Sequence, residues 1–154
     1  MSQLKGACII GQSGGPTSVI NASAYGAIKT ALESDSITRV LGARHGIKGV
    51  LDDDLIDMGK EDPQELEMMK FTPSSALGSC RYKLKDPDED DTDYKRILEI
   101  FKKYDVRYFF YNGGTTKGCK ANTHLHHRIQ PTHKMFEATP QRAKSIRDVY
   151  KRQA

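Results

Sequence analysis

Cysteine is scarce in this sequence, and a long apolar run is missing altogether. The three cysteines, Cys8, Cys80 and Cys119, show no paired spacing along the 154 residues, which argues against a disulfide scaffold and favours a reducing compartment. A membrane-spanning helix needs about 18 or more consecutive apolar residues, and no such run occurs. Residues 1–10 also lack the apolar core and the cleavage site of a secretory signal. We therefore expect a cytoplasmic protein that does not enter a membrane.

Two common phosphate-binding motifs are missing as well. Residues 11–17 read Gly-Gln-Ser-Gly-Gly-Pro-Thr, which matches neither a Walker loop nor the G-x-G-x-x-G dinucleotide motif. The loop stands between an apolar run and a helical pattern. Its glycines let backbone N–H groups approach a ligand, and the start of the following helix favours anions. The loop therefore predicts a phosphate cradle, with a tight turn that binds nothing as the alternative.

Charge is divided unevenly along the chain. Residues 1–114 carry 15 Lys+Arg and 18 Asp+Glu, whereas residues 115–154 carry 9 and 2 and hold four of the five histidines. A length near 150 residues is typical of one domain, and such a break in composition indicates a boundary. Residues 148–153 also match one translated frame of a transposon end used in sequencing libraries. We therefore expect one domain over residues 1–114, followed by a basic tail over residues 115–154 that is disordered or artefactual.

The spacing of apolar residues predicts strands that alternate with helices. Short apolar or aromatic runs predict three strands, at residues 5–10, 39–44 and 106–112. Apolar residues at helical spacing predict three helices, over residues 18–32, 62–71 and 93–104. We expect residues 45–49 to be a loop and residues 51–57 to be a short strand or a loop. This order indicates an α/β fold with a parallel, Rossmann-like sheet, in which ligands bind at the carboxyl ends of the strands.

Two further loops carry residues suited to phosphate. Arg81 follows small residues in the loop Gly-Ser-Cys-Arg-Tyr-Lys at 78–83, and a guanidinium donates a fork of hydrogen bonds to phosphate. Asn-Gly-Gly at 112–114 ends the aromatic strand. A solvated arginine and an ordinary turn are the alternatives for these two loops. Because the loops after residues 10 and 111 both follow predicted strands, we expect them to face one cleft.

Taken together and in order, these segments resemble the amino-terminal portion of the phosphofructokinase family. The resemblance covers about residues 4–114 and is carried by SGGPTSVIN at 13–21, GIKGVL at 46–51, LGSCRYKL at 77–84 and YFFYNGG at 108–114. Pro16 after the two glycines, where ATP-dependent members have Asp, is similar to the pyrophosphate-dependent branch. The resemblance implies an incomplete phosphofructokinase-type amino-terminal domain that binds the phosphoryl donor.

The resemblance also implies a reaction and a set of residues. The reaction is transfer of a phosphoryl group from pyrophosphate to fructose 6-phosphate in glycolysis, with Mg²⁺, in a parent enzyme that is a homo-oligomer. Such transfer depends on positioning and on charge neutralisation. By family position the donor phosphates contact Gly14, Gly15, Arg81, Tyr82, Gly113 and Gly114. His45 and Lys48 lie in the matching donor-side loop and take no assigned role.

The chain departs from the family pattern after Gly114. The family continues with a carboxylate-bearing loop that helps to hold magnesium and then with Thr-Ile-Asp, whose Asp is the catalytic base. Here Thr115-Thr116-Lys117 follows, and Thr-Ile-Asp does not occur; Mg²⁺ prefers carboxylate and other oxygen ligands. We therefore expect a fragment that is inactive alone, with no catalytic residue and no metal ligand of its own. An ATP-dependent phosphofructokinase fragment and a non-catalytic phosphate-binding module are the alternatives.

The tail and the acidic stretch allow other functions. Cysteine and histidine in the tail are zinc-ligand types, but their spacing matches no known finger: Cys119, His124, His126, His127 and His133. The positive charge of the tail is compatible with nucleic acid, but no recognition motif accompanies it, so we do not expect nucleic-acid binding. The acidic run at residues 86–93 lacks the ligand order of an EF-hand. We interpret it as a solvated loop that leads into the helix at 93–104.

Overall fold

The structure is a computed structural model that describes residues 4–13, 19–80, 82, 84–86 and 88–113, together with the backbone of residues 134–138. Five strands form one sheet: β1 (Gly6–Gln12), β2 (Ile37–Ala43), β3 (Leu55–Asp57), β4 (Val106–Asn112) and β5 (Lys134–Ala138). The helices are α1 (Ile20–Leu32), α2 (Ile47–Leu51), α3 (Pro63–Met68) and α4 (Thr92–Lys103), with short 3-10 helices η1 (Met58–Lys60) and η2 (Met69–Phe71).

The sheet has the order β3-β2-β1-β4-β5 and is mainly parallel. Strand β1 lies in the centre and pairs in parallel with β2 on one side and with β4 on the other. Strand β5 pairs in parallel with β4, whereas β3 runs antiparallel to β2. The α/β fold with a parallel Rossmann-like core is therefore confirmed, and the antiparallel edge strand makes the sheet mixed.

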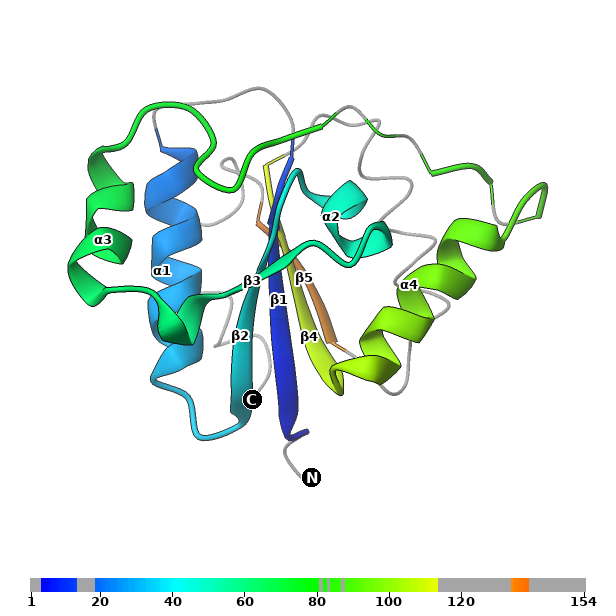
Figure 1. Cartoon of the computed structure of the whole chain (residues 1–154), viewed down its shortest axis with the longest axis horizontal. Helices are drawn as coiled ribbons and strands as arrows, with labels where there is room; N and C mark the ends of the chain where they lie inside the picture. Colours follow the sequence, from blue (N-terminus) through cyan, green and yellow to red (C-terminus); the bar gives the residue numbers. More distant parts are fainter. Residues whose placement is uncertain are drawn as a thin grey trace.

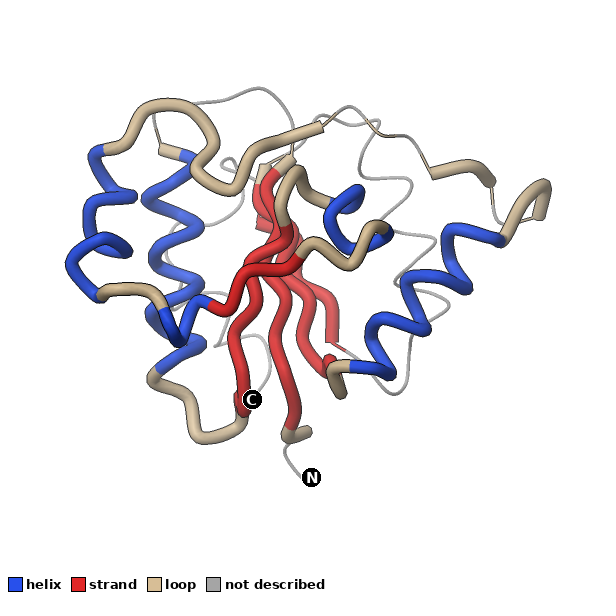
Figure 2. Tube along the Cα trace, viewed as in Figure 1, coloured by secondary structure: helices blue, strands red, loops and turns tan. Residues whose placement is uncertain are grey.

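Helices cover both faces of the sheet, as Figure 1 shows, with α1 and α3 on one face and α2 and α4 on the other. The alternation of side chains along β1 explains the two cores. Ala7 and Ile9 belong to the cluster that packs on α4, and Cys8 and Ile10 belong to the cluster that packs on α1. Figure 2 shows the same arrangement, with the strands between two helical layers.

Helix α4 is the amphipathic helix that the sequence predicts. Its apolar face buries Tyr94, Ile97, Ile100 and Phe101. The ring of Phe101 packs against that of Phe109 of β4 in a tilted arrangement, with ring centroids 5.5 Å apart. Within the described part of the chain, no helix is long and apolar enough to cross a membrane.

Cys8 lies in the buried strand β1. Its thiol is fully buried, and burial raises its pKa far above the usual range. A thiol in such a place acts as a small apolar side chain.

One local prediction is wrong. Residues 47–49, expected to lie in a loop, begin helix α2, because Ile47 and Val50 are buried on one face over a stretch too short to show periodicity. Residues 51–57, expected to be a short strand or a loop, contain β3, which runs antiparallel to β2 at the edge of the sheet. The turn from α2 to β3 is closed by the Asp54 N–H, which donates to the carbonyl of Gly49 at 2.8 Å. Because this connection is short, the chain returns along β2 in the opposite direction.

Strand β5 lies in the segment that the composition assigns to the tail. Its backbone pairs from Tyr108↔Lys134 to Asn112↔Ala138, although the sequence around it shows no strand pattern. The rest of residues 115–154 lies outside the described residues, including every zinc-ligand candidate named above. The boundary at residue 114 stays a prediction.

Candidate functional site

The candidate site lies at the carboxyl end of β1. From β1 the chain passes through α1 to β2 on one side, and β4 occupies the other side. Such a change of direction opens a crevice beyond the carboxyl ends of the strands, where open α/β sheets bind ligands. The ends of β1 and β4 and the start of α1 meet at this edge of the sheet (Figure 1).

The two glycine-containing loops begin side by side, as the sequence predicts. The N–H of Ser13, after β1, donates to the carbonyl of Asn112, at the end of β4, at 2.8 Å. Gly113 follows with φ +87, and a Cβ atom there would lie 2.2 Å from the carbonyl oxygen of Ser13. Only glycine fits a left-handed backbone with so close a neighbour. The approach of the two loops is therefore fixed by Gly113.

Three buried amide side chains connect the strand ends to α1; we call Gln12, Asn21 and Asn112 the amide network. Gln12 Nε2 donates to Asn21 Oδ1 at 2.9 Å and to the carbonyl of Ile20 at 3.3 Å. Asn112 Nδ2 donates to the same Ile20 carbonyl at 2.7 Å. All three side chains are almost fully buried. The first turn of α1 is thus held between β1 and β4.

The amide network also holds the loop that precedes Arg81. Gln12 Oε1 accepts hydrogen bonds from Ser75 Oγ and from the Leu77 N–H, both at 2.8 Å. Asn21 Oδ1 accepts from the Ala76 N–H at 2.8 Å, and Asn21 Nδ2 donates to the carbonyl of Thr72 at 2.8 Å. Gln12 therefore uses both amide hydrogens and both acceptor positions of its oxygen.

The N-cap residue of α1 is Val19, whose apolar side chain makes no capping hydrogen bond. Uncapped N–H groups at a helix start are free to bind an anion, and the helix dipole favours negative charge there.

Tyr111 fixes a third loop beside these ends. The Ile47 N–H donates to the Tyr111 hydroxyl at 3.3 Å, and Gly46 lies against the carbonyl of Gln12, with φ +64. Burial raises the pKa of Tyr111, although hydrogen bonds to Ser13 and Ile47 lower it in part. The phenol is therefore neutral and serves as a rigid support.

A surface pocket of about 320 Å³ opens next to this loop. Its polar lining contains Arg44, His45 and Lys48 together with Asp52 and Asp54, and Cys80 completes one side. Arg44 Nε lies 3.8 Å from Asp54 Oδ1. His45 and Lys48, which have no role from the sequence, therefore share one pocket with the residue that precedes Arg81.

Of the six donor-binding residues expected from the sequence, two lie in the described part of the chain. Gly113 stands at the meeting point of the two loops, and Tyr82 donates its hydroxyl to Asp93 Oδ2 at 2.9 Å. The remaining four lie outside the described residues: Gly14, Gly15, Arg81 and Gly114.

The sequence motifs assign no role to the amide network. One feature of the sequence does indicate it: Gln12 and Asn112 each end an apolar strand, and a polar side chain that becomes buried there must find hydrogen-bond partners. Asn21 sits in a helix whose other buried residues are apolar. Only the tertiary structure shows that these three amides face one another.

The described residues do not fit a magnesium site. Among them, no group of three or more His, Cys, Asp or Glu side chains converges. The side-chain oxygen of Gln12 at the strand ends is already fully used by hydrogen bonds, and Mg²⁺ is usually held through carboxylates. We therefore derive no step through a metal.

Known proteins resemble this chain over most of its length. The family model described as Phosphofructokinase matches residues 7–135. A pyrophosphate–fructose 6-phosphate 1-phosphotransferase of Methylococcus capsulatus is 51% identical over 115 residues, which are 74% of this chain and 27% of that protein. The enzyme of the same name from Halomonas elongata is 49% identical over 115 residues, again 74% of this chain and 27% of that protein.

Solved structures agree with the sequence comparison. The pyrophosphate-dependent phosphofructokinase of Nitrosospira multiformis superposes with a TM-score of 0.74 at 39% identity, covering 85% of this chain and 32% of that one. This chain thus spans about a third or less of the length of these relatives. The match of the family model also extends beyond residue 114.

Proposed function

The chain belongs to the phosphofructokinase family, and from that premise we propose that it forms the phosphoryl-donor-binding part of an enzyme that transfers phosphate from pyrophosphate to fructose 6-phosphate. The observation that carries this proposal is the meeting of Ser13 and Gly113 beside the uncapped start of α1. Glycine-containing loops at a helix start offer backbone N–H groups to an anion.

The residues proposed for the donor are Gly14, Gly15, Arg81, Tyr82, Gly113 and Gly114. In the proposal, the backbone at the glycines donates to phosphate oxygens, and the Arg81 guanidinium neutralises their charge. Phosphoryl transfer needs mainly such positioning and charge compensation. The amide network supports the proposal because it fixes the strand ends, α1 and the loop before Arg81 without adding a negative charge.

Pyrophosphate is the proposed donor because the relatives from Methylococcus capsulatus and Halomonas elongata are named for it. We also propose a cytoplasmic location and a homo-oligomeric parent enzyme. Magnesium belongs to the proposal for that longer enzyme and not to the described residues. Because Thr-Ile-Asp does not occur in the 154 residues, we propose that the chain alone binds pyrophosphate without transferring it.

Calorimetric titration of the full chain with inorganic pyrophosphate tests this function. We expect saturable binding that is tighter than the binding of ATP or of inorganic phosphate. Arg81→Ala should weaken pyrophosphate binding about tenfold or more, since a charge-assisted bidentate contact is lost. Arg39→Ala removes the same charge on β2, from a side chain that pairs with Asp57, and should leave the affinity within about twofold.

Three outcomes would contradict parts of the proposal. Tighter binding of ATP than of pyrophosphate would point to the ATP-dependent alternative. Turnover of pyrophosphate with fructose 6-phosphate by the chain alone would show that it is active. No binding of any phosphate compound at millimolar concentration would overturn the donor-binding function itself.

A further inference from the structure

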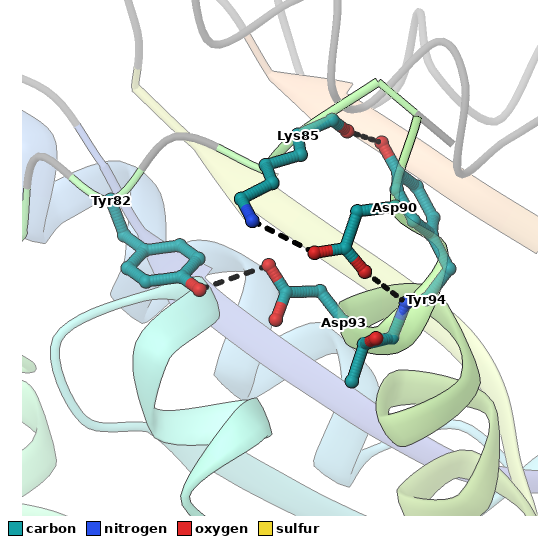
Figure 3. Close-up of polar contacts among 6 residues, drawn as sticks. Tyr82, Lys85, Asp90, Asp93 and Tyr94 are labelled. Carbon is teal, nitrogen blue, oxygen red and sulfur yellow. Dashed lines mark hydrogen bonds and ion pairs between the residues drawn. The ribbon is translucent and has the colours of Figure 1, made fainter. Parts of the chain in front are cut away.

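The segment after Arg81 is fastened to the start of α4 by several contacts, which Figure 3 shows together. Tyr82 donates its hydroxyl to Asp93 Oδ2 at 2.9 Å, and Lys85 Nζ donates to Asp90 Oδ2 at 2.8 Å. The hydroxyl of the buried Tyr94 donates to the carbonyl of Lys85 at 3.1 Å. We call Tyr82, Lys85, Asp90 and Asp93 the α4 clamp.

The two carboxylates of the clamp are engaged rather than merely solvated. Asp90 Oδ1 accepts from the Thr92 N–H at 3.1 Å while its other oxygen accepts from Lys85. The hydrogen bond from Lys85 holds the pKa of Asp90 well below its usual range, with the bonds to Thr92 acting in the same direction. The acidic run that the sequence suggested to be a solvated loop therefore contributes two side chains that hold a neighbouring segment.

A buried apolar contact adds to these polar contacts between the segment after Arg81 and α4. Leu84 is 6% exposed and lies in the same core cluster as Tyr94 and Phe101 of α4. Leu84 and Tyr82 thus contact α4 through an apolar contact and a hydrogen bond, and Lys85 forms an ion pair with Asp90 just before the helix. Each of these alone is weak at an exposed site, but together they fix one short segment against one helix.

Tyr82 of the clamp is the next residue in the chain after Arg81, which we propose to bind the donor phosphate. Cys80 lines the pocket that holds Arg44 and His45, and Tyr82 is held by Asp93. These two positions flank Arg81 in the sequence. A group that must meet an anion gains affinity when the segment that carries it is ordered before binding.

We propose that Asp93 is a positioning residue, which holds the Arg81 segment ready for the phosphoryl donor through its hydrogen bond to Tyr82, with the Lys85–Asp90 ion pair as a second fastening. This inference rests on the proposed function. A positioning role for Asp93 predicts that removing its carboxylate weakens pyrophosphate binding, which is the opposite of what charge repulsion alone predicts. A carboxylate close to an anion site repels the anion, so its removal should tighten binding unless the carboxylate serves to position the site.

Calorimetric titration of each full-chain variant with inorganic pyrophosphate shows whether removal of the carboxylate weakens or tightens binding. We expect Asp93→Ala and Tyr82→Phe each to weaken pyrophosphate binding about five- to tenfold, and the double variant to be no weaker than either one, because both remove the same hydrogen bond. Asp93→Asn, whose amide oxygen can still accept from Tyr82, should keep more of the affinity than Asp93→Ala. Glu99→Ala is the matched control, because it removes a carboxylate from the same helix that pairs with Arg96 instead.

Two results would overturn the positioning role while leaving the proposed function intact. One is wild-type or tighter pyrophosphate binding by Asp93→Ala, which is the electrostatic expectation. The other is a loss in Tyr82→Phe without a loss in Asp93→Ala, which would mean that Tyr82 acts on the donor independently of Asp93. Near-UV circular dichroism of each variant separates these results from a failure to fold, and Tyr82→Phe provides the conservative second change.

Amide hydrogen exchange of residues 82 and 84–86 tests the clamp without any phosphate. Faster exchange in Asp93→Ala than in Glu99→Ala would support the clamp, and equal exchange would overturn it. If the wild-type chain bound no pyrophosphate, the proposed function would fail and the positioning role with it. The exchange data would still decide whether the clamp itself exists.

Discussion

The amide network and the α4 clamp both tie a loop to the start of a helix, but by different chemistry. Gln12, Asn21 and Asn112 are buried and uncharged, and they join β1, β4 and α1 to the loop at residues 72–77. The clamp uses carboxylates, a lysine and a phenol at the surface, where Lys85 keeps 67% of its side chain exposed. Buried neutral hydrogen bonds give a fixed frame, whereas exposed ion pairs are weakened by acid and by salt.

The difference in charge between the amide network and the α4 clamp suits the position that each has relative to the proposed anion site. The amide network lies directly at the strand ends, where fixed carboxylates would repel phosphate. The carboxylates of the clamp engage Tyr82 and Lys85, which follow Arg81 in the chain. We infer that the frame at the strand ends is neutral and that the segment after Arg81 is held by charged groups.

The largest effect is expected in the amide network. Gln12→Leu keeps a similar volume but removes four hydrogen bonds and leaves the buried Leu77 N–H without its acceptor. Each lost hydrogen bond costs about 1 kcal/mol and an unsatisfied buried group about 1–3 kcal/mol, so we expect the free energy of unfolding to fall by about 4 kcal/mol. Urea unfolding of the wild type and of Gln12→Leu measures this loss of unfolding free energy. Gln64→Leu, at an exposed position on α3, should change it by less than about 0.5 kcal/mol, and an equal loss at both positions would contradict the network's role.

The next effect is expected where the two loops meet. Gly113→Ala introduces a Cβ 2.2 Å from the carbonyl of Ser13 at a φ of +87. We expect a loss of about 2 kcal/mol in unfolding free energy, together with weaker pyrophosphate binding. Gly59→Ala is the control, because its Cβ would meet Asp57 Oδ1 at an ordinary 3.4 Å. A fully stable Gly113→Ala variant would show that the close approach is not maintained in solution.

A smaller effect with a clear dependence on pH is expected in the clamp. The pKa of Asp90 is lowered in the folded chain, first by its hydrogen bond with Lys85, and the pKa of Lys85 is raised, first by the same bond. The stability that Asp90 contributes is therefore present above its unfolded pKa of about 3.9 and is lost as the pH falls further. The part due to Lys85 is present below about pH 10.4 and is lost as the pH rises through the raised value.

Asp90→Asn tests this dependence, since an amide oxygen can still accept from Thr92. Its urea midpoint should lie below that of the wild type at about pH 7, and the difference should shrink steadily as the pH falls below about 3.9 toward the lowered pKa of the folded state. A difference that does not shrink below about pH 3.9 would show that the Lys85–Asp90 pair is not its source.

The smallest effect expected is that of salt. Raising NaCl to about 1 M shortens the Debye length to about 3 Å and should reduce the midpoint difference between the wild type and Asp90→Asn. The difference between the wild type and Gln12→Leu should stay the same, because its partners are neutral and buried. Equal sensitivity of both differences to salt would remove the distinction between the neutral network and the charged clamp.

Much of the fold follows from local pattern. The apolar run of β1, the helical spacing of Ile97 and Phe101 in α4, and the aromatic β4 are each long enough to show their period. Helix α2 and strand β3 are too short for that, and their placement depends on the turn between Gly49 and Asp54. Strand β5 is specified by its parallel pairing with β4 and not by a pattern of its own.

Part of the candidate site could likewise be predicted from residue type, and part could not. The glycines and Arg81 could be named from residue type, because glycine is needed for close approach and arginine suits phosphate. Of these residues, the described structure places Gly113 against Ser13. The roles of Gln12 and Asp93 could not be predicted, since each depends on a partner from a distant or separate element.

By itself, the sequence determined the alternation of strands and helices, the family, and the loops where an anion can approach. Periodicity and glycine content are local properties that the chain shows before it folds. Only the tertiary structure decided that Gln12 meets Leu77 and that Tyr82 meets Asp93. Hydrogen bonds of this kind join groups that the packing of α1 and α4 on the sheet brings together, and no spacing along the chain specifies them.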